Sequence, residues 1–314
     1  MNVVLVALYK YQNFPIRMMH SLLESIEGVT PHTIFFKDHS NNIFNPPSEK
    51  ELDIFVQQII DLNPKLVGFS VLSPYFYVAK RLTKLIKDNL STLVIWGGIH
   101  PTISPKSSIK EADILCIGEG EGPLLDLVKL LRDKKDYQNI DNLWVNSGCQ
   151  IIKNNLRPLE QDLDLLPFPS YANESFYFID SNIIKKSDPV LLDNKLLIQT
   201  SRGCPFVCSY CVNSLLKPMS KNLGNYTRRR SVDNIIKEIK ENLNLPGNKR
   251  KYIFFIDEVF GTNEKWLNEF ESTYKKEIGL PFLVEYNPLS INSKVLSKLA
   301  GCGLDTINFG IQTG

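Results

Sequence analysis

The chain has 314 residues, of which 43% are hydrophobic and 22% charged, values that are ordinary for a packed protein and exclude a disordered chain, a collagen-like repeat and a coiled coil. Its 36 Lys and Arg residues nearly balance 34 Asp and Glu residues, so the net charge of +2 lacks the strong basic field typical of nucleic-acid-binding proteins. Apolar runs stay below the roughly 18 residues of a membrane helix, and Val3–Leu8 is too short for a signal-peptide core. We therefore expect a cytoplasmic protein. In that reducing compartment, its six cysteines indicate metal binding or catalysis rather than disulfides.

The first 135 residues alternate short apolar runs with amphipathic stretches. Ser48 followed by Glu51 predicts a helix that begins with a capping box, and Ser73 followed by Pro74 predicts a second capped helix. We predict that residues 1–140 form a doubly wound, Rossmann-like (flavodoxin-like) parallel sheet, which would bind ligands beyond the carboxyl ends of its strands. The predicted strands, whose nearly continuous apolar sequence is typical of burial on both faces, are Val3–Leu8, Thr33–Phe36, Leu66–Ser70, Leu93–Trp96 and Ile114–Ile117.

The alternation of apolar runs and amphipathic stretches stops in residues 141–194. We expect these residues to be a linker that contains a short hairpin made by Leu143–Val145 and Gln150–Ile152. Alternation resumes in residues 195–314, which predict a second α/β unit. Its last predicted strand lies just before Gly314, so we expect this unit to be incomplete. The four predicted strands of this unit are Leu196–Thr200, Tyr252–Ile256, Phe282–Tyr286 and Thr306–Phe309.

Three cysteines, Cys204, Cys208 and Cys211, give the strongest functional signal, because they lie within eight residues directly after a predicted buried strand. Three thiolates on one short loop can hold three irons of a 4Fe–4S cluster and leave the fourth iron open to a small molecule. A zinc site is an alternative, but it needs a fourth ligand, and no His follows position 100. Three buried structural cysteines are the other alternative. The remaining cysteines are isolated, and we interpret them as small hydrophobic residues: Cys116, Cys149 and Cys302.

The C-x3-C-x2-C spacing, with Tyr210 directly before the third cysteine, resembles that of radical S-adenosylmethionine (radical SAM) enzymes. The resemblance implies that the three cysteines are the metal ligands of the cluster, with Phe206 and Tyr210 beside the cofactors. It further implies that the open iron binds the amino and carboxylate groups of S-adenosylmethionine, and that reduction by a donor such as flavodoxin or ferredoxin releases a 5′-deoxyadenosyl radical. The fold that it implies for this unit is a partial (β/α)6 barrel.

Weaker matches to the same family follow the later strands. Asp257 and Glu258 end the second strand of this unit, where the family places an acidic residue against the methionine ammonium group. Glu258 is the better candidate, and a pair of solvated loop acids is the alternative. Gly310 and Gln312 follow the fourth strand in a segment that the resemblance places near the ribose and methionine, although many relatives carry Glu at the position of Gln312. Arg228–Arg230 supply a basic residue before the next helix, or else a solvated charge run.

Two loops in the N-terminal half resemble those of cobalamin (B12)-binding domains. Ser70 and Leu72 follow the third strand as S-x-L, and Gly97 and Gly98 follow the fourth. The resemblance implies a serine hydroxyl against the detached benzimidazole base, and glycines that let the backbone approach the nucleotide tail. Further residues in loops that resemble those of cobalamin-type radical enzymes are His100, Glu119, Gly120 and Glu121, the last three opening a helix whose free N–H groups suit a polar ligand edge.

The loop after the first strand, residues 9–15, departs from the D-x-H-x-x-G pattern of cobalamin domains that ligate cobalt through histidine. The lower cobalt face would therefore be open, water-bound or covered by another side chain. His100 lies in a different loop, and we interpret it as a hydrogen-bonding residue rather than a cobalt ligand.

Together the two resemblances imply a B12-dependent radical SAM enzyme that modifies an unactivated carbon of a small molecule, with methyl transfer from methylcobalamin as the favoured reaction. Several alternatives stay open. They are a non-methylating cyclisation, rearrangement or oxidation; a fragment that binds cofactors without turnover; and an N-terminal domain that acts as a structural cap without cobalamin.

Overall fold

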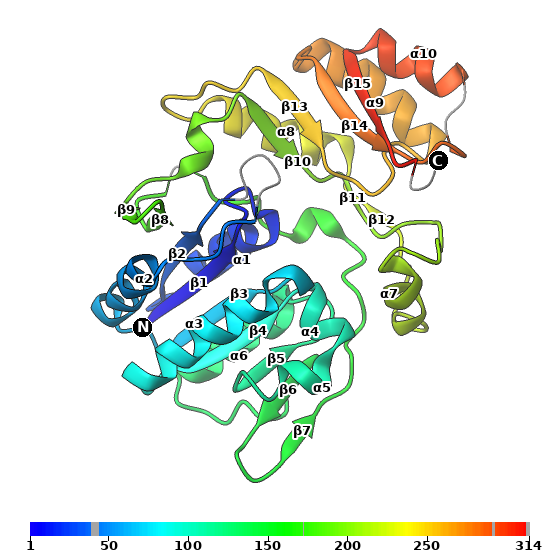
Figure 1. Cartoon of the computed structure of the whole chain (residues 1–314). Coiled ribbons are helices and arrows are strands. Elements are labelled where there is room, and N and C mark those ends of the chain that lie inside the picture. Colours follow the sequence, from blue (N-terminus) through cyan, green and yellow to red (C-terminus); the bar gives the residue numbers. More distant parts are fainter. Residues whose placement is uncertain (39–43, 172, 291–292, 312–314) are drawn as a thin grey trace. The chain divides into compact units, whose positions relative to one another are not determined.

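The computed structural model describes residues 1–38, 44–171, 173–290 and 293–311. The chain divides into two compact units (Figure 1). Unit 1 comprises Met1–Arg157 and Pro167–Val190, and unit 2 comprises Pro158–Leu166 and Leu191–Gly314. Within the described part of the chain, no helix is both long enough and apolar enough to cross a membrane.

Unit 1 is built on a nine-stranded sheet in the order β7-β6-β5-β4-β3-β1-β2-β8-β9. Its central strands pair in parallel in the order 5-4-3-1-2, which is the flavodoxin-like order. The doubly wound parallel sheet predicted from the sequence is therefore confirmed. These central strands are β1 (Asn2–Leu8), β2 (Thr30–Phe36), β3 (Leu66–Ser70), β4 (Leu93–Gly97) and β5 (Ile114–Cys116).

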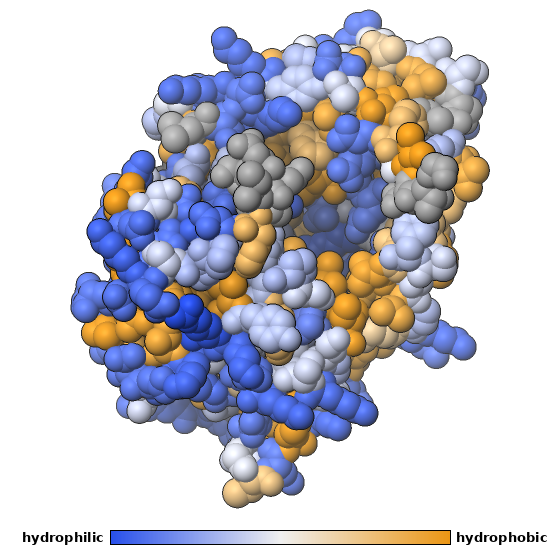
Figure 2. All heavy atoms as spheres, in the orientation of Figure 1, coloured by the Kyte–Doolittle hydropathy of each residue, from blue (hydrophilic) through white to orange (hydrophobic). Residues whose placement is uncertain are grey.

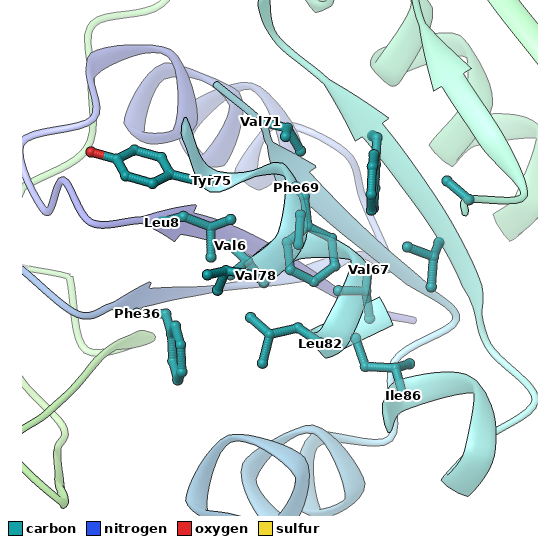
Figure 3. Packing of buried hydrophobic residues seen from close by; sticks show 14 of the residues in the cluster. Val6, Leu8, Phe36, Val67, Phe69, Val71, Tyr75, Val78, Leu82 and Ile86 are labelled. Carbon is teal, nitrogen blue, oxygen red and sulfur yellow. The ribbon is translucent and has the colours of Figure 1, made fainter. Parts of the chain in front are cut away.

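Helices cover both faces of this sheet. Side chains such as Val4 and Val6 of β1 pack into one core, whereas Val3 and Leu5 pack into the other. Figure 3 shows the first core, where side chains of β1 to β3 meet those of one helix. Burial on both faces explains why these strands appear as unbroken apolar runs in the sequence. The long helices of unit 1 are α1 (Phe14–Glu24), α2 (Glu49–Leu62), α3 (Phe76–Asn89) and α6 (Glu121–Arg132), and the short ones are α4 (Ile99–Ile103) and α5 (Pro105–Ser108).

Of the two helix starts predicted from the sequence, one is confirmed and the other is wrong. The capping box is confirmed, because Ser48 Oγ accepts the backbone N–H of Glu51 while the Glu51 carboxylate accepts the N–H of Ser48. The cap predicted at Ser73 is wrong: Ser73–Tyr75 form a 3-10 turn, and α3 begins only at Phe76. The Ser73 hydroxyl bonds to His100 instead, a partner that local sequence patterns do not reveal.

Residues 141–194 contribute four strands to the edges of the sheet, rather than forming only a linker with a hairpin. β6 (Leu143–Asn146) and β7 (Ile151–Lys153) form the expected hairpin, and β6 pairs antiparallel with β5. β8 (Phe176–Asp180) pairs in parallel with β2, and β9 (Ile183–Lys185) pairs antiparallel with β8. The partner strand of β8 lies far away in the chain, so local alternation gave no sign of it.

Unit 2 contains a four-stranded parallel sheet in the order β10-β13-β14-β15, with three helices packed along it (Figure 1). This is the arrangement predicted for the beginning of a (β/α)6 barrel. The Ser231 hydroxyl caps the first of these helices by accepting the N–H of Asn234. The elements are β10 (Lys195–Ile198), β13 (Tyr252–Phe255), β14 (Phe282–Tyr286), β15 (Leu304–Phe309), α8 (Val232–Leu243), α9 (Glu264–Glu277) and α10 (Ser293–Gly301).

A two-stranded antiparallel ribbon follows β10, made by β11 (Ser201–Arg202) and β12 (Arg228–Arg229). The loop between these two strands contains the cysteine motif and α7 (Asn213–Met219). Residues 158–166 pack on the same loop, since the N–H of Leu159 donates to the carbonyl oxygen of Leu223 at 2.8 Å.

The face of the molecule drawn in Figure 2 is hydrophilic over most of its area, with smaller apolar areas between. Exposed apolar side chains are normal on protein surfaces. In unit 2, several of them belong to the cysteine loop and α7: Val207, Tyr210 and Leu215.

Candidate functional site

The cysteine loop begins at a glycine that no other residue could replace without a shift of the backbone. Gly203 follows β11 and has φ +80°, in the left-handed region that favours glycine. A Cβ atom at this position would overlap the carbonyl oxygen of Tyr226, in the segment that leads into β12. The close approach holds both ends of the cysteine loop together.

Each of the three cysteine sulfurs has a hydrogen-bond donor. The backbone N–H of Phe206 donates to Cys204, the hydroxyl of Tyr210 pairs with Cys208, and Nδ2 of Asn213 lies 3.6 Å from Sγ of Cys211. Donors of this kind stabilise thiolates that ligate metal. Cys204 is buried, whereas Cys208 and Cys211 are half-buried.

The pKa of Cys204 is raised, first by burial and then by the charges of Glu258 and the two other cysteines, against the lowering effect of the Phe206 N–H. Three groups that repel one another as thiolates favour a cation among them. Within the described residues, however, no three His, Cys, Asp or Glu side chains are close enough to hold a single metal ion. In a 4Fe–4S cluster each cysteine binds a different iron, so the sulfurs need not converge on one point. The loop is therefore compatible with a cluster.

Asp257, the second residue after β13, is fully buried and accepts hydrogen bonds from the segment that follows β10. The backbone N–H of Thr200 lies 3.1 and 3.2 Å from its two oxygens, and the hydroxyls of Thr200 and Ser201 also donate to it. Burial raises the pKa of Asp257, against the lowering effects of Ser201, Arg229 and Thr200. These bonds give Asp257 a positioning role: it fixes the chain just before the cysteine loop.

Glu258 is exposed, and the negative charge of its carboxylate raises the pKa of Cys204. The protein around it raises its pKa by desolvation, and Asp257 and Glu285 raise it further, while Arg202 lowers it. A carboxylate near the cysteine loop is suited to hold a ligand cation. That Glu258 rather than Asp257 contacts the ligand stays a prediction. It is supported by the surroundings of the two residues, because Glu258 is exposed and Asp257 is buried.

Arg229 brings positive charge to the carboxyl ends of β10 and β13. Its guanidinium donates to the hydroxyls of Thr200 and Thr262, at 3.2 and 3.1 Å, and lies 4.7 Å from the centre of the Trp266 ring. Its neighbour Arg230 forms a buried ion pair with Glu238 and is therefore structural. The alternative of a solvated charge run is therefore wrong for Arg228 and Arg230, which are both buried.

The other predicted residues of unit 2 are placed as follows. Phe206 is half-buried and Tyr210 is 66% exposed, both on the cysteine loop. Gly310 is exposed directly after β15. Gln312 lies outside the described residues.

In unit 1, the loops after β3 and β4 are joined by their backbones. The N–H of Val71 donates to the carbonyl oxygen of Gly97 at 2.8 Å, and the N–H of His100 donates to the carbonyl oxygen of Val71 at 3.0 Å. Ser70 is half-buried, and Leu72 is exposed at the same edge of the sheet. The S-x-L and Gly-Gly elements therefore form one continuous surface at the carboxyl ends of the strands.

Different structural constraints favour glycine at the two glycine positions of this surface. Gly98 has φ +97°, and a Cβ atom there would lie 3.0 Å from both the backbone nitrogen and oxygen of Val71. At Gly97 a Cβ atom would meet its nearest atom at 3.7 Å, which is an ordinary contact. Packing between loops thus accounts for Gly98, whereas space for a ligand remains the reason to expect glycine at position 97.

His100 pairs through Nδ1 with the Ser73 hydroxyl at 2.9 Å and packs against the Phe76 ring. Burial lowers its pKa, so the ring is neutral near pH 7. Its Nε2 is buried without a hydrogen-bond partner among the described residues. A buried polar atom of this kind fits a ligand polar group at the same edge of the sheet.

Two residues outside the predicted set of site residues hold the loop after β5, one of them by joining it to this surface. The Thr102 hydroxyl donates to the Gly98 carbonyl oxygen at 2.8 Å and accepts the N–H of Gly118 at 3.0 Å. Asn142 is 3% exposed, and its Nδ2 donates to the carbonyl oxygen of Glu119 at 2.9 Å. No sequence pattern marks Asn142, whereas Thr102 ends the segment Ile99–Thr102, which resembles a loop of cobalamin-type radical enzymes. The predicted residues of this loop are half-buried at the start of α6: Glu119, Gly120 and Glu121.

The loop after β1, where a cobalt-ligating histidine was absent from the sequence, is held by a buried arginine. Arg17 donates to the carbonyl oxygen of Tyr11 at 3.1 and 2.7 Å and forms a two-pronged ion pair with Asp188 at 2.7 and 2.8 Å. Its guanidinium also lies 4.4 Å from the centre of the Phe35 ring. These contacts fix the loop within unit 1.

Comparison with known protein families finds a match for each of the two regions that contain the candidate sites. The family model of the B12 binding domain matches residues 3–128, and the model of the radical SAM superfamily matches residues 198–314. The chain is a B12-binding-domain-containing radical SAM protein. The matches confirm the family, the order of its two domains and the cofactors predicted from the sequence, namely cobalamin, S-adenosylmethionine and the cluster that radical SAM proteins carry.

Among curated relatives, an uncharacterised methyltransferase of Pyrococcus horikoshii is 28% identical over 80% of this chain and 52% of its own length. The anaerobic magnesium-protoporphyrin IX monomethyl ester cyclase of Synechocystis is 28% identical over 54% of this chain and 32% of its own length. The bacteriochlorophyllide d C-8(2)-methyltransferase of Chlorobaculum tepidum is 24% identical over 70% of this chain and 44% of its own length. The radical SAM protein thus spans about half or less of the length of these relatives.

Solved structures share its fold at low sequence identity. The radical SAM methyltransferase TsrM of Kitasatospora setae, determined with cobalamin and a [4Fe-4S] cluster, superposes with a TM-score of 0.74 at 16% identity, over 98% of this chain and 60% of that one. The cobalamin-dependent radical enzyme OxsB, with aqua-cobalamin and S-adenosylmethionine bound, gives a TM-score of 0.69 at 19% identity, over 99% of this chain and 44% of that one. At these identities, the likeness establishes the fold.

Proposed function

We propose that this chain carries the cofactors of a B12-dependent radical SAM enzyme that transfers a methyl group to an unactivated carbon of a small molecule. The observation that carries the proposal is the presence in one chain of both domains, each with its predicted loops at the carboxyl ends of a parallel sheet. Ligands of such sheets bind at that edge.

In unit 2, Cys204, Cys208 and Cys211 hold the cluster. The cluster and S-adenosylmethionine, when bound, supply radical chemistry that no protein side chain can provide. Glu258 receives the methionine ammonium group, since it is exposed while Asp257 is fully engaged by Thr200 and Ser201. Asp257 holds the strand end from which the cysteine loop departs.

In unit 1, the joined loops at Ser70, Gly97 and His100 receive cobalamin. Gly98 and Thr102 keep these loops in contact, so the surface is formed before the ligand binds. His100 offers an unpaired Nε2 to a polar group of the cofactor. Preformed sites of this kind lower the ordering cost of binding.

Methyl transfer is favoured because two relatives are described as methyltransferases. A second candidate, ring formation without methylation, is supported by the relatives described as cyclases. A 4′-phospho-dehydrooxetanocin synthase of Priestia megaterium, 24% identical over 65% of this chain, is a further relative that is not described as a methyltransferase. In either case we propose a small electron-transfer protein, such as flavodoxin or ferredoxin, as the reductant.

The test is to reconstitute the full chain anaerobically with iron, sulfide and hydroxocobalamin and to incubate it with S-adenosylmethionine and dithionite. We expect release of 5′-deoxyadenosine or S-adenosylhomocysteine that depends on the three cysteines, with Cys149→Ser as the matched control. Formation of neither product by the wild type would overturn the proposal. With candidate substrates, a product enlarged by one labelled methyl group separates methylation from cyclisation.

A further inference from the structure

The sulfur of Cys211 lies at the end of a chain of hydrogen bonds that begins at Tyr226. The Tyr226 hydroxyl donates to Oδ1 of Asn213, and Nδ2 of Asn213 lies 3.6 Å from Sγ of Cys211. Asn213 is the first residue of α7 and is 6% exposed. Water therefore competes little for its amide, and hydrogen bonds in such surroundings are strengthened.

The direction of the Asn213 amide is set by the sulfur, and the Tyr226 hydroxyl holds the amide in that direction. An amide has one accepting oxygen and one donating NH2 group. If the group were reversed, its oxygen would face the sulfur of Cys211, and two electron-rich atoms would repel each other. Donation by the Tyr226 hydroxyl to the oxygen favours the orientation that points the NH2 group at the sulfur.

Tyr226 is itself held in place. Its carbonyl oxygen packs where a side chain on Gly203 would stand, and Nε of Arg228 donates to the same oxygen at 3.4 Å. The β11–β12 ribbon, in which Arg202 pairs with Arg228, fixes this backbone beside the start of the cysteine loop. The loop that supplies the cysteines thus also supplies a rigid support for the Asn213 amide.

We propose that Asn213 is a positioning residue that donates a hydrogen bond to the Cys211 thiolate when this cysteine is a cluster ligand, that Tyr226 fixes its amide, and that the pair raises the reduction potential of the cluster. A hydrogen bond to a ligating sulfur withdraws negative charge and thereby favours the reduced, more electron-rich cluster. The inference rests on the proposed function, because it requires that the three cysteines bind a cluster.

The test is a redox titration of the reconstituted full chain, followed by electron paramagnetic resonance. Asn213→Leu removes the donor and keeps the number and branching of the side-chain heavy atoms. We expect its equilibrium constant for reduction to fall about tenfold, which corresponds to a shift of about 59 mV to lower potential for one electron. Tyr226→Phe removes one oxygen atom and leaves the amide in place but less well fixed, so we expect a smaller shift in the same direction.

Ser214→Ala is the matched control. The Ser214 hydroxyl donates to the carbonyl oxygen of Cys211 at 2.7 Å, so this variant removes a hydrogen bond to the same residue but not to its sulfur. We expect its potential to equal that of the wild type. A second readout is the coupling of an exchangeable proton to the reduced cluster, which Asn213→Leu should remove and Ser214→Ala should retain.

Iron and sulfide contents are measured before each titration. A loaded Asn213→Leu variant with the wild-type potential, or with the same shift as Ser214→Ala, would overturn the inference and leave the proposed function standing. If Asn213→Leu does not load, Tyr226→Phe decides, because an unchanged potential in that variant also contradicts the role of the pair. A wild-type chain that binds no cluster would remove both the inference and the proposed function.

Discussion

A side chain on Gly203 would occupy the position of the Tyr226 carbonyl oxygen. This contact joins the two ends of the loop that contains the three cysteines, at the point where the β11–β12 ribbon opens. The geometry of the cysteines therefore depends on a residue that carries no functional group.

Gly203→Ala should disorganise the cysteine loop. The left-handed φ costs about 1–3 kcal/mol for a non-glycine residue, and the overlap with Tyr226 forces one of the two backbone segments to move. We expect the variant to lose most of its iron on reconstitution, as measured by metal analysis. Gly247→Ala is the control, because Gly247 has φ +73° but no atom within 4 Å of its Cβ position. It should lose only the same 1–3 kcal/mol, roughly, for the left-handed φ and keep its iron. Equal iron loss in both variants would contradict the account.

Asp257→Asn should destabilise unit 2. An amide cannot accept all the hydrogen bonds that Thr200 and Ser201 donate to the buried carboxylate, and each buried donor left without an acceptor costs roughly 1–3 kcal/mol. Chemical denaturation followed by circular dichroism measures the change. A variant as stable as the wild type would show that Asp257 does not position the strand end.

Glu258→Gln should instead leave the fold unchanged and weaken the binding of S-adenosylmethionine. A charge-assisted hydrogen bond is worth roughly 1.5–3 kcal/mol, so we expect the affinity to fall about tenfold or more. Calorimetric titration of the reconstituted protein gives the dissociation constant, and an affinity equal to that of the wild type would rule out contact with the ammonium group.

The binding of S-adenosylmethionine should also depend on pH through Glu258. Desolvation by the surrounding protein and the neighbouring carboxylates raise its pKa above the ordinary 4.5, so the carboxylate becomes protonated at a higher pH than a free glutamate in water. As the pH falls through this raised pKa, the charge is lost and the affinity of the wild type should decline. The affinity of Glu258→Gln should stay level over the same range, and a parallel decline in both proteins would assign the effect to another group.

The sequence predicted those features that depend on local pattern. Continuous apolar runs indicated the five central strands of unit 1, the Ser48–Glu51 spacing indicated a capping box, and the cysteine spacing indicated the cluster loop. Each of these signals lies within a few residues of the feature that it predicts.

Features that depend on distant contacts could not be predicted in this way. β8 pairs with β2 across more than a hundred residues, and Ser73 bonds to His100 rather than capping a helix. Asn213 and Tyr226 acquire a role only because the loop folds back on itself. Asp257 looked like a second candidate acid until its partners on the neighbouring strand were known.

Alanine substitutions at the paired glycines should separate packing from ligand binding in unit 1. Gly98→Ala forces the loop away from Val71, so we expect loss of cobalamin retention on gel filtration together with reduced stability. Gly97→Ala meets only ordinary contacts in the protein and should fold normally. If it also loses cobalamin, a ligand approaches the backbone at position 97; if it retains cobalamin fully, that predicted contact is wrong.

The most direct measurement is the metal content of the chain after anaerobic reconstitution, compared with that of Cys204→Ser/Cys208→Ser/Cys211→Ser and of Cys149→Ser. We predict about four irons and four sulfides per chain in the wild type and in Cys149→Ser, and neither in the triple variant. The spectrum of the reduced wild-type cluster should change when S-adenosylmethionine is added, because one iron is open. A wild-type chain that holds only zinc, or a triple variant that keeps its full iron content, would contradict the account.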